Sequence, residues 1–289
     1  MPELPEVETV RRGLAQQTLQ RTCMGGEVLL ARTIAAPDSD QFLAALEQTQ
    51  IQEWQRRGKY LLANLQQGDR PAGTWGVHLR MTGQFFWTTP ETPITKHTRV
   101  RLQFEGAREL RFIDIRSFGQ MWWVPPDRPV ESVITGLAKL GPEPFAPEFT
   151  ARYLHSKLQR SQRPIKTALL DQALVAGIGN IYADESLFLS GIHPTIPSDR
   201  LTKVQVEKLR EAIVEVLTVS IGAGGTTFSD FRDLTGVNGN YGGQAWVYGR
   251  KDQLCRVCGT PIQKLKLAGR SSHFCPNCQP YSSMRSRAK

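Results

Sequence analysis

Four cysteines near the C-terminus form two close pairs, Cys255-x-x-Cys258 and Cys275-x-x-Cys278, with sixteen residues between the pairs. Two such pairs supply four thiolates for a closed tetrahedral Zn²⁺ site, and the metal stabilises a segment too short to build its own core. Because protein ligands would fill all four positions, the spacing predicts one structural Zn²⁺. Two disulfides or a redox pair are the alternatives. The fifth cysteine, Cys23, is expected to be a buried or idle thiol.

The residues between the two cysteine pairs are rich in basic side chains: Lys264, Lys266, Arg270 and His273. This is the composition of a hairpin that touches phosphates. A solvated basic hairpin is the alternative.

The N-terminus offers a possible nucleophile. Pro2 is small enough for the initiator methionine to be removed, which leaves a secondary amine that titrates near pH ~8. Attack on a sugar C1′ would give an iminium with no N–H to lose, an electron sink for eliminating the 3′ and 5′ phosphates. Glu3 and Glu6 lie three apart on the helix that follows and could move protons. By themselves, however, these residues more often mark an ordinary helix N-terminus.

The net charge of +9 and the pI near 9.5 favour a polyanionic partner, although a merely basic protein would show the same values. No apolar run is long enough to cross a membrane, and the acidic, amphipathic N-terminus does not resemble a secretory signal. We therefore expect a soluble intracellular protein, long enough at 289 residues for about two domains.

The periodicity of apolar residues changes along the chain. Between residues 26 and 124 the pattern is mostly of strands, as in the alternating segment 97–105, and it favours a β-sandwich or barrel. A proline-rich linker follows, and then the period becomes helical. A glycine-rich segment, 222–245, is too long for an ordinary connection and is expected to be a functional loop or disordered. The expected helices are 3–16, 42–46, 149–160, 165–176, 180–190 and 202–221.

Several motifs follow one another along nearly the whole chain: Met-Pro-Glu-Leu-Pro-Glu-Val-Glu-Thr-Val at the N-terminus, Arg57-Gly-Lys59-Tyr-Leu-Leu, His78-Leu-Arg-Met81-Thr-Gly, Asp114-Ile-Arg116-Ser-Phe118-Gly, Pro164-Ile-Lys166, Gly177-Ile-Gly-Asn180-Ile-Tyr182-Ala-Asp-Glu185 and Arg270-Ser-Ser-His-Phe-Cys275-Pro-Asn-Cys278-Gln. In this order they are similar to the motifs of bacterial formamidopyrimidine-DNA glycosylase, also called 8-oxoguanine DNA glycosylase. The match is highly specific.

The resemblance implies a catalytic set of Pro2, Glu3, Lys59 and Arg270. Pro2 would be the Schiff-base nucleophile and Glu3 the acid/base that helps to open the deoxyribose ring. Lys59 would be an electrophile and phosphate contact near the lesion, where the residues alone suggest only an exposed strand lysine. Arg270 matches a contact to the DNA backbone.

The resemblance also implies a set of DNA-binding residues: His78, Met81, Arg116, Phe118, Lys166, Asn180 and Tyr182. Met81, Arg116 and Phe118 would fill the hole left by the everted nucleotide, although from sequence alone Met81 and Phe118 are more typical of a core. Asn180, otherwise a plain helix cap, and Lys166 match contacts to the DNA backbone. Ser117 departs from the bulkier or basic residue that relatives often carry, which could slightly alter this wedge.

The fold that the resemblance implies is α+β, with an N-terminal β-sandwich and flanking helices, a helix–two-turn–helix domain and a C-terminal β-hairpin zinc finger. The expected segments are a catalytic domain at 2–130, a helix–two-turn–helix domain at 145–222, a loop over the everted base at 223–246 and the zinc finger at 247–282. Duplex DNA with an oxidised base is the expected partner, bound in the positively charged cleft between the domains. A cytoplasmic, nucleoid-associated bacterial monomer is expected.

The activity that the resemblance implies is a bifunctional glycosylase and AP lyase, acting on oxidised purines and cutting the DNA by β,δ-elimination. A sister enzyme, endonuclease VIII, prefers oxidised pyrimidines, but that branch typically begins Pro-Glu-Gly-Pro, whereas this chain begins Pro2-Glu3-Leu4-Pro5 after Met1. A non-catalytic DNA-binding zinc protein would not need Pro2 and Glu3. A transcription factor with a zinc ribbon would not explain the β-rich half.

Overall fold

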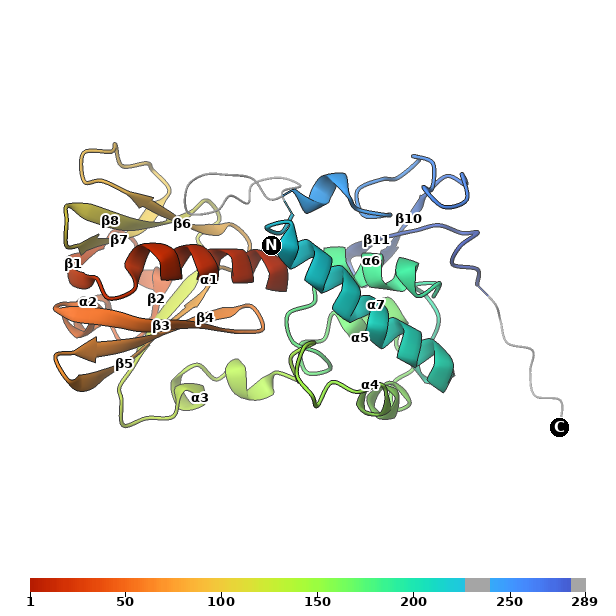
Figure 1. Cartoon of the computed structure of the whole chain (residues 1–289), viewed down its shortest axis with the longest axis horizontal. Coiled ribbons are helices and arrows are strands. Elements are labelled where there is room, and N and C mark those ends of the chain that lie inside the picture. Colours follow the sequence, from red (N-terminus) through yellow and green to blue (C-terminus); the bar gives the residue numbers. More distant parts are fainter. Residues whose placement is uncertain (227–239, 282–289) are drawn as a thin grey trace. The chain divides into compact units, whose positions relative to one another are not determined.

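The structure is a computed structural model, and it describes residues 1–226 and 240–281 (Figure 1). Most of the predicted loop at 223–246 therefore lies outside the described residues. The chain divides into two compact units: unit 1 holds residues 1–139 and 220–242, and unit 2 holds residues 140–219 and 243–289. The described residues at the two edges of that loop, 223–226 and 240–242, fall in unit 1.

Unit 1 opens with a helix and continues as strands. Its helices are α1 (Leu4–Thr18), η1 (Ala31–Thr33), α2 (Ser39–Leu46), α3 (Val130–Val133) and η2 (Leu137–Lys139). Its strands are β1 (Thr22–Val28), β2 (Ile34–Ala36), β3 (Thr49–Arg57), β4 (Tyr60–Gln67), β5 (Arg70–His78), β6 (Gly83–Thr88), β7 (Thr98–Phe104), β8 (Arg108–Asp114) and β9 (Gln120–Val124). The predicted helices near 3–16 and 42–46 are present as α1 and α2, and the side chain of Asp38 accepts the Gln41 N–H at 2.9 Å to start α2.

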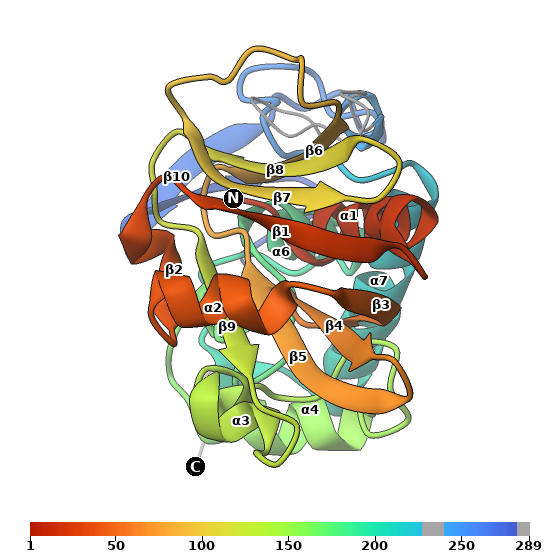
Figure 2. The ribbon, with the colours of Figure 1, turned by 90° about the vertical axis from the view of Figure 1, so that its left-hand side faces the viewer.

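The nine strands form one sheet in the order β2-β9-β5-β4-β3-β1-β7-β8-β6. Strand β1 pairs with β7 from Cys23 to Val28 but with β3 only at Thr22 and Cys23. The sheet folds at this narrow junction into two layers, which Figure 2 shows above and below one another. Trp75 of one layer meets Phe85 of the other edge-on, with ring centroids 5.9 Å apart. The predicted β-sandwich is confirmed.

Unit 2 is helical and ends in a hairpin. Its elements are α4 (Ala151–Leu158), α5 (Ile165–Leu169), α6 (Asn180–Leu189), η3 (Ser198–Arg200), β10 (Gln263–Leu267) and β11 (Arg270–Phe274). The long helix α7 (Lys203–Gly222) begins in this unit, and η4 (Tyr241–Gly243) spans the later boundary. Strands β10 and β11 pair antiparallel and form the predicted hairpin between the cysteine pairs.

One helix prediction is wrong in extent. Helix α5 ends at Leu169, whereas the sequence pattern continues to 176. The side chain of Gln172 donates to the carbonyls of Leu170 and Ile178 and accepts the N–H of Gly177. These side-chain bonds pair backbone groups in two turns; in a continuing helix, the backbone groups would have paired with one another. No helix within the described residues is long and apolar enough to cross a membrane.

Candidate active site and DNA-binding residues

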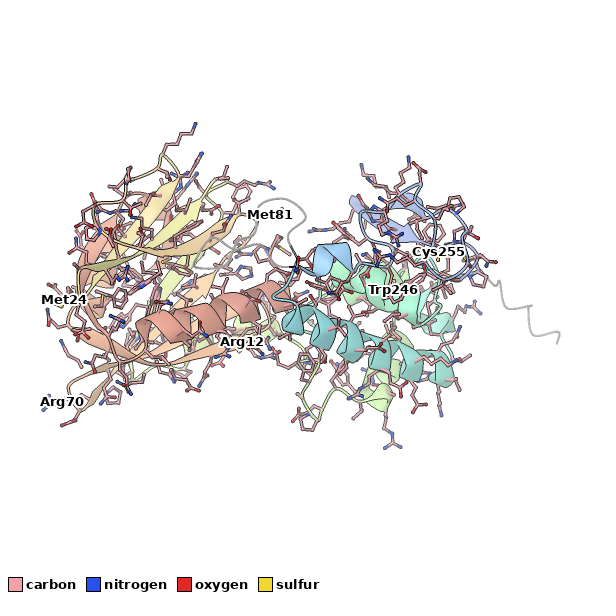
Figure 3. The ribbon with its side chains drawn as sticks, turned by 45° about the horizontal axis from the view of Figure 1, so that its top comes forward. Arg12, Met24, Arg70, Met81, Trp246 and Cys255 are labelled. Atoms are coloured by element: carbon pink, nitrogen blue, oxygen red, sulfur yellow. The ribbon has the colours of Figure 1, made fainter. Side chains whose placement is uncertain are left out.

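Strand register gathers the predicted residues of unit 1 at one end of the sandwich. Tyr60, just after Lys59, pairs with His78, and His78 pairs with Gln120 at the start of β9. The β3–β4 turn, the end of β5 and the segment before β9 therefore lie side by side. In Figure 3, Met24 and Arg70 are drawn at the end of unit 1 opposite to the one where Met81 is drawn.

Helix α1 directs its N-terminus toward this end. Arg11 donates to the carbonyl of Trp54 on β3 at 3.2 Å, and one turn earlier Glu8 pairs with Arg56 at 3.3 Å. The N-terminus of α1 and the Lys59 end of β3–β4 therefore run in the same direction. Pro2 and Glu3, which precede the helix, are both buried.

Glu3 and Glu6 form a reciprocal capping box at the start of α1. The Glu3 side chain accepts the Glu6 N–H, and Glu6 Oε2 accepts the Glu3 N–H at 2.8 Å. The second oxygen, Glu6 Oε1, accepts the N–H of Thr226 at 2.8 Å. Gly225 has φ +79°, and a Cβ there would lie 3.0 Å from that same oxygen, so this close approach requires glycine. The sequence suggested Glu6 for proton transfer, and the structure shows that Glu6 also holds the backbone of Glu3.

Lys59 and His78 are buried in the same region, with 6% and 8% of their surface exposed. Lys59 is therefore not the exposed strand lysine that the residues alone suggest. His78 Nδ1 accepts the N–H of Arg80 at 3.0 Å, and the ring meets Tyr60 edge-on at 4.6 Å. Burial, and then the positive charges of Arg80 and Lys59, lower the pKa of His78 to about 3. The imidazole is therefore neutral, with Nε2–H as its donor.

The segment 115–119 presents Arg116 and Phe118, and the buried carboxylate of Asp114 organises it. Asp114 accepts the N–H groups of Arg116 at 3.2 Å and Gly119 at 2.7 Å, and it also accepts the Thr82 hydroxyl. A Cβ on Gly119 would lie 2.5 Å from the Phe112 ring, which explains the glycine. Asp114 belongs to a motif that the chain shares with the family it resembles, but the sequence alone indicates no role for it.

The side chains on this segment point outward. Phe118 is 52% exposed, and the Arg116 guanidinium lies 5.0 Å from the centroid of its ring. The expectation that Phe118 would be a core residue, drawn from the residues alone, is therefore wrong. Ser117, between them, has φ +55°. Met81, at the other side of the Thr82 contact, is partly buried.

In unit 2 the predicted DNA-binding residues fall into two groups. Asn180 begins α6, at the positive end of the helix dipole, and its buried Oδ1 has no hydrogen-bond partner within the described residues. Arg270 is exposed at the start of β11. Lys166 and Tyr182, by contrast, are buried, with 1% and 0% exposed. The Lys166 ammonium donates to the Asn180 carbonyl at 2.5 Å and to Asp184 at 2.7 Å.

The four finger cysteines meet the requirements of a zinc site. Their Sγ atoms lie within 4.8 Å of one another, and all five cysteines in the described residues are free of disulfides. A tetrahedral Zn²⁺ with Zn–S bonds of about 2.3 Å needs Sγ atoms at roughly this spacing. The finger packs on α6 through Phe188, which stacks on Trp246 at 5.7 Å (Trp246 and Cys255 are labelled in Figure 3). A basic hollow of about 410 Å³ lies beside the hairpin, lined by Lys251, Lys264, Leu265, Lys266, Gly269 and Ser271.

A β-sandwich with a buried Pro2, a helical unit and a four-cysteine finger are the parts expected of a helix–two-turn–helix DNA glycosylase. Three family models match the chain: the formamidopyrimidine-DNA glycosylase N-terminal domain at residues 1–121, the formamidopyrimidine-DNA glycosylase H2TH domain at 140–232, and the zinc finger found in FPG and IleRS at 252–280. The chain belongs to the formamidopyrimidine-DNA glycosylase family.

Relatives and solved structures agree. A formamidopyrimidine-DNA glycosylase of Synechococcus sp. is 86% identical over 282 residues, which cover 98% of this chain and all of the relative, and that of Acaryochloris marina is 61% identical with the same coverage. A Lactococcus lactis FPG mutant in complex with Fapy-dG containing DNA has a TM-score of 0.88 and 36% identity, and covers 96% of this chain. MutM in complex with carbocyclic 8-oxo-G containing DNA has the same three values.

Proposed function

We propose that this chain excises oxidised purines, 8-oxoguanine and formamidopyrimidines, from duplex DNA and then cuts the backbone, with the nitrogen of Pro2 as its nucleophile. The activity is that of a DNA glycosylase and AP lyase, as its family membership indicates. The observation that carries the role of Pro2 is the head of α1, where the buried Pro2 precedes a glutamate held by its own capping box.

The chemistry starts once Met1 has been removed and Pro2 carries a secondary amine. Its nitrogen attacks C1′ of the damaged nucleotide; the N–C1′ bond forms as the glycosidic bond breaks, and the base leaves with the bonding pair. The departing base gains a proton and the Pro2 nitrogen loses its own, so the protons balance. Glu3 delivers a proton to the ring oxygen O4′, which opens the sugar and leaves an iminium between Pro2 and C1′. Lys59, buried beside His78, contributes positive charge near this centre.

The iminium makes the C2′ proton acidic. Loss of that proton expels the 3′ phosphate, and a second elimination expels the 5′ phosphate, which together are the β,δ-elimination. Water then hydrolyses the iminium and regenerates the free amine of Pro2. No step in this sequence needs an oxidant or a redox cofactor, because each bond that forms is balanced by one that breaks.

Eversion of the damaged nucleotide leaves a hole in the duplex that Met81, Arg116 and Phe118 are proposed to fill. The exposed ring of Phe118 and the guanidinium over it suit this role, because an apolar wedge unstacks bases and arginine can hydrogen-bond the orphaned partner base. The turn that Asp114 organises holds both side chains before DNA arrives.

Phosphate contacts are proposed for His78 in unit 1 and for Asn180 and Arg270 in unit 2. His78 would bind as a neutral donor, Asn180 through the N–H groups of its side-chain amide at the start of α6, and Arg270 as an exposed cation. Lys166 and Tyr182 are buried, so we assign them to supporting α6 in place of the direct contacts first predicted. Zn²⁺, held by Cys255, Cys258, Cys275 and Cys278, supplies the cross-link that stabilises the finger.

We further propose that the protein acts as a monomer on damaged duplex DNA in the bacterial cytoplasm, in association with the nucleoid. Solved relatives are complexes with DNA containing carbocyclic 8-oxo-G, Fapy-dG or an abasic site, which supports this partner.

Borohydride trapping tests the proposal, because only an iminium is reduced to a stable protein–DNA crosslink. One duplex carries a single 8-oxoguanine opposite cytosine and a parallel duplex carries thymine glycol. We expect strong crosslinking to the first, at Pro2. Pro2→Gly should crosslink weakly, since a primary amine still forms an imine, and Glu3→Gln should lose base excision.

Preferential crosslinking of the thymine glycol duplex would assign the chain to oxidised pyrimidines. No crosslink to either duplex, from protein verified to lack Met1 and to hold zinc, would leave a DNA-binding scaffold without chemistry. Full base excision by Glu3→Gln would overturn the assigned role of Glu3.

A further inference from the structure

One buried carboxylate, that of Asp184, connects three segments of unit 2. Asp184 is fully buried on α6 and accepts the Lys166 ammonium of α5 at 2.7 Å. It also accepts the Ser272 hydroxyl of β11 at 2.9 Å and the N–H of His273 at 2.9 Å, and His273 Nδ1 lies 3.3 Å away. Such a buried charge is tolerated only when it is paired and hydrogen-bonded, and both conditions hold here.

The partners of Asp184 lie next to the proposed phosphate ligands. Asn180 precedes Asp184 by four residues and so lies on the same face of α6, one turn earlier. Arg270 precedes Ser272 by two residues and so lies on the same face of β11. Lys166 closes the arrangement, because its ammonium bonds both to Asp184 and to the Asn180 carbonyl.

The hairpin needs such a support. Strands β10 and β11 form a two-stranded sheet, and an isolated hairpin of two strands is marginally stable in water. The zinc ligands lie at or beyond the far end of β11 from Arg270, since Cys275 directly follows the strand. Zinc therefore secures one end of the hairpin, and Asp184 secures the middle of β11 and the direction in which Arg270 points.

We infer that Asp184 is a positioning residue for DNA binding, which holds Asn180 and Arg270 at a fixed spacing through Lys166 and Ser272. The inference rests on the proposed phosphate contacts of Asn180 and Arg270. Asp184 does not touch DNA itself; it presets the two ligands so that binding does not have to order them.

The test compares Asp184→Asn and Ser272→Ala with Arg270→Ala, in full-length protein with zinc content verified. Ser271→Ala is the matched control, because Ser271 has the same chemistry but lies on the opposite face of the strand. Affinity for a duplex with an uncleavable abasic-site analogue is measured by fluorescence anisotropy over a range of KCl concentrations. Single-turnover excision at saturating protein is measured in parallel.

We expect Ser272→Ala and Asp184→Asn to weaken binding about 5- to 10-fold and to lower the slope of log K against log[KCl] by roughly 0.9, the value for one phosphate contact. Excision at saturation should change less than about twofold, since the reacting groups lie elsewhere. The double variant Ser272→Ala/Arg270→Ala should bind no more weakly than Arg270→Ala alone, because both remove the same contact.

Two outcomes would overturn the inference in different ways. If Arg270→Ala lowers the slope while Ser272→Ala behaves like Ser271→Ala, Arg270 binds phosphate but does not depend on Asp184. If Arg270→Ala leaves the slope unchanged, the proposed phosphate contact is wrong, and the inference is wrong with it. Ser272→Ala removes one neutral hydroxyl only, so it decides the question even if Asp184→Asn does not fold.

Discussion

Glu6 has a larger role at the residue scale than its place in the sequence suggests. Both of its carboxylate oxygens are used, one by the N–H of Glu3 and the other by the N–H of Thr226. The first bond fixes Glu3, which directly follows the proposed nucleophile Pro2, and the second fixes Thr226, near the start of the glycine-rich segment. Catalysis that depends on a preorganised amine and acid should therefore be sensitive to Glu6.

We predict that Glu6→Ala lowers the free energy of unfolding by about 2 kcal/mol, since it leaves two buried donors unpaired. It should also slow borohydride trapping by roughly tenfold or more, because Glu3 is no longer held. Chemical denaturation and the time course of crosslinking measure the two effects. Glu8→Gln is the control, since Glu8 pairs with Arg11, Arg12 and Arg56 on the same helix. Equal loss of trapping in both variants would contradict a specific role for Glu6.

The lowered pKa of His78 predicts how the stability of the protein depends on pH. This pKa falls from an ordinary 6.5 to about 3 in the folded chain, mainly because of burial. Between these values the unfolded chain binds a proton that the folded chain does not, so stability is complete above pH 6.5 and decreases as the pH falls toward 3. At pH 4 the cost from this one group is roughly 3 kcal/mol.

Denaturation of the protein and of His78→Gln at several pH values tests this expectation. The stability of His78→Gln should decrease less steeply below pH ~6.5, whereas above pH ~7 the two profiles should run parallel. Parallel profiles over the whole acidic range would show that His78 is protonated in the fold.

The segment that carries Arg116 and Phe118 makes the prediction at the scale of an element. Asp114 holds this segment through Arg116, Gly119 and Thr82, so Asp114→Ala should leave the wedge disordered while the nucleophile is intact. We expect release of 8-oxoguanine to slow by roughly tenfold or more, and trapping on a preformed abasic site to change by less than about threefold, because an abasic site has no base to evert. Thr98→Ala, another buried polar change in this sheet, is the control for general destabilisation. A parallel fall of both activities in Asp114→Ala would refute the assignment.

Elements with a regular pattern were predictable from the sequence, and elements held by single side chains were not. Strand β7 alternates as its apolar residues require: Val100, Leu102 and Phe104 are buried, and Gln103 is exposed. The end of α5 depends on Gln172, whose three bonds replace a helix that the pattern otherwise supports. Periodicity carries no information about such a bond.

The candidate site divides in the same way. The resemblance identified Glu3, whereas the spacing of the finger cysteines predicted a zinc site without it, and the four cysteines do converge. It also marked Lys166 and Tyr182 as DNA contacts, yet both are buried. Burial of a lysine depends on a distant partner, here Asp184, eighteen residues later, and one sequence does not show which residues meet. Sheet order was likewise out of reach, because β1 joins β3 and β7 across long stretches of chain.

At the scale of the whole molecule, the net charge and the zinc site together predict how DNA binding depends on salt and on zinc. The excess of 36 basic over 27 acidic side chains should give binding that weakens steeply with salt. The proposed reacting groups, Pro2, Glu3 and Lys59, belong to unit 1, whereas the finger and Arg270 belong to unit 2. Loss of zinc should therefore remove phosphate contacts without removing the chemistry.

We predict that Cys258→Ser loses zinc, weakens duplex binding about tenfold or more, and lowers the salt slope by at least ~0.9, since the hairpin loses its cross-link and Arg270 its position. At low salt and saturating protein, crosslinking at Pro2 should persist. Zinc content, anisotropy titrations at several salt concentrations and borohydride trapping measure these effects, with Cys23→Ser, a thiol far from the finger in sequence, as the control. An unchanged slope after verified loss of zinc would contradict this prediction, because either the hairpin makes no phosphate contact or Asp184 holds Arg270 in place without zinc. Loss of crosslinking even at saturation would mean that the finger supports the fold of the catalytic unit and not only its hold on DNA.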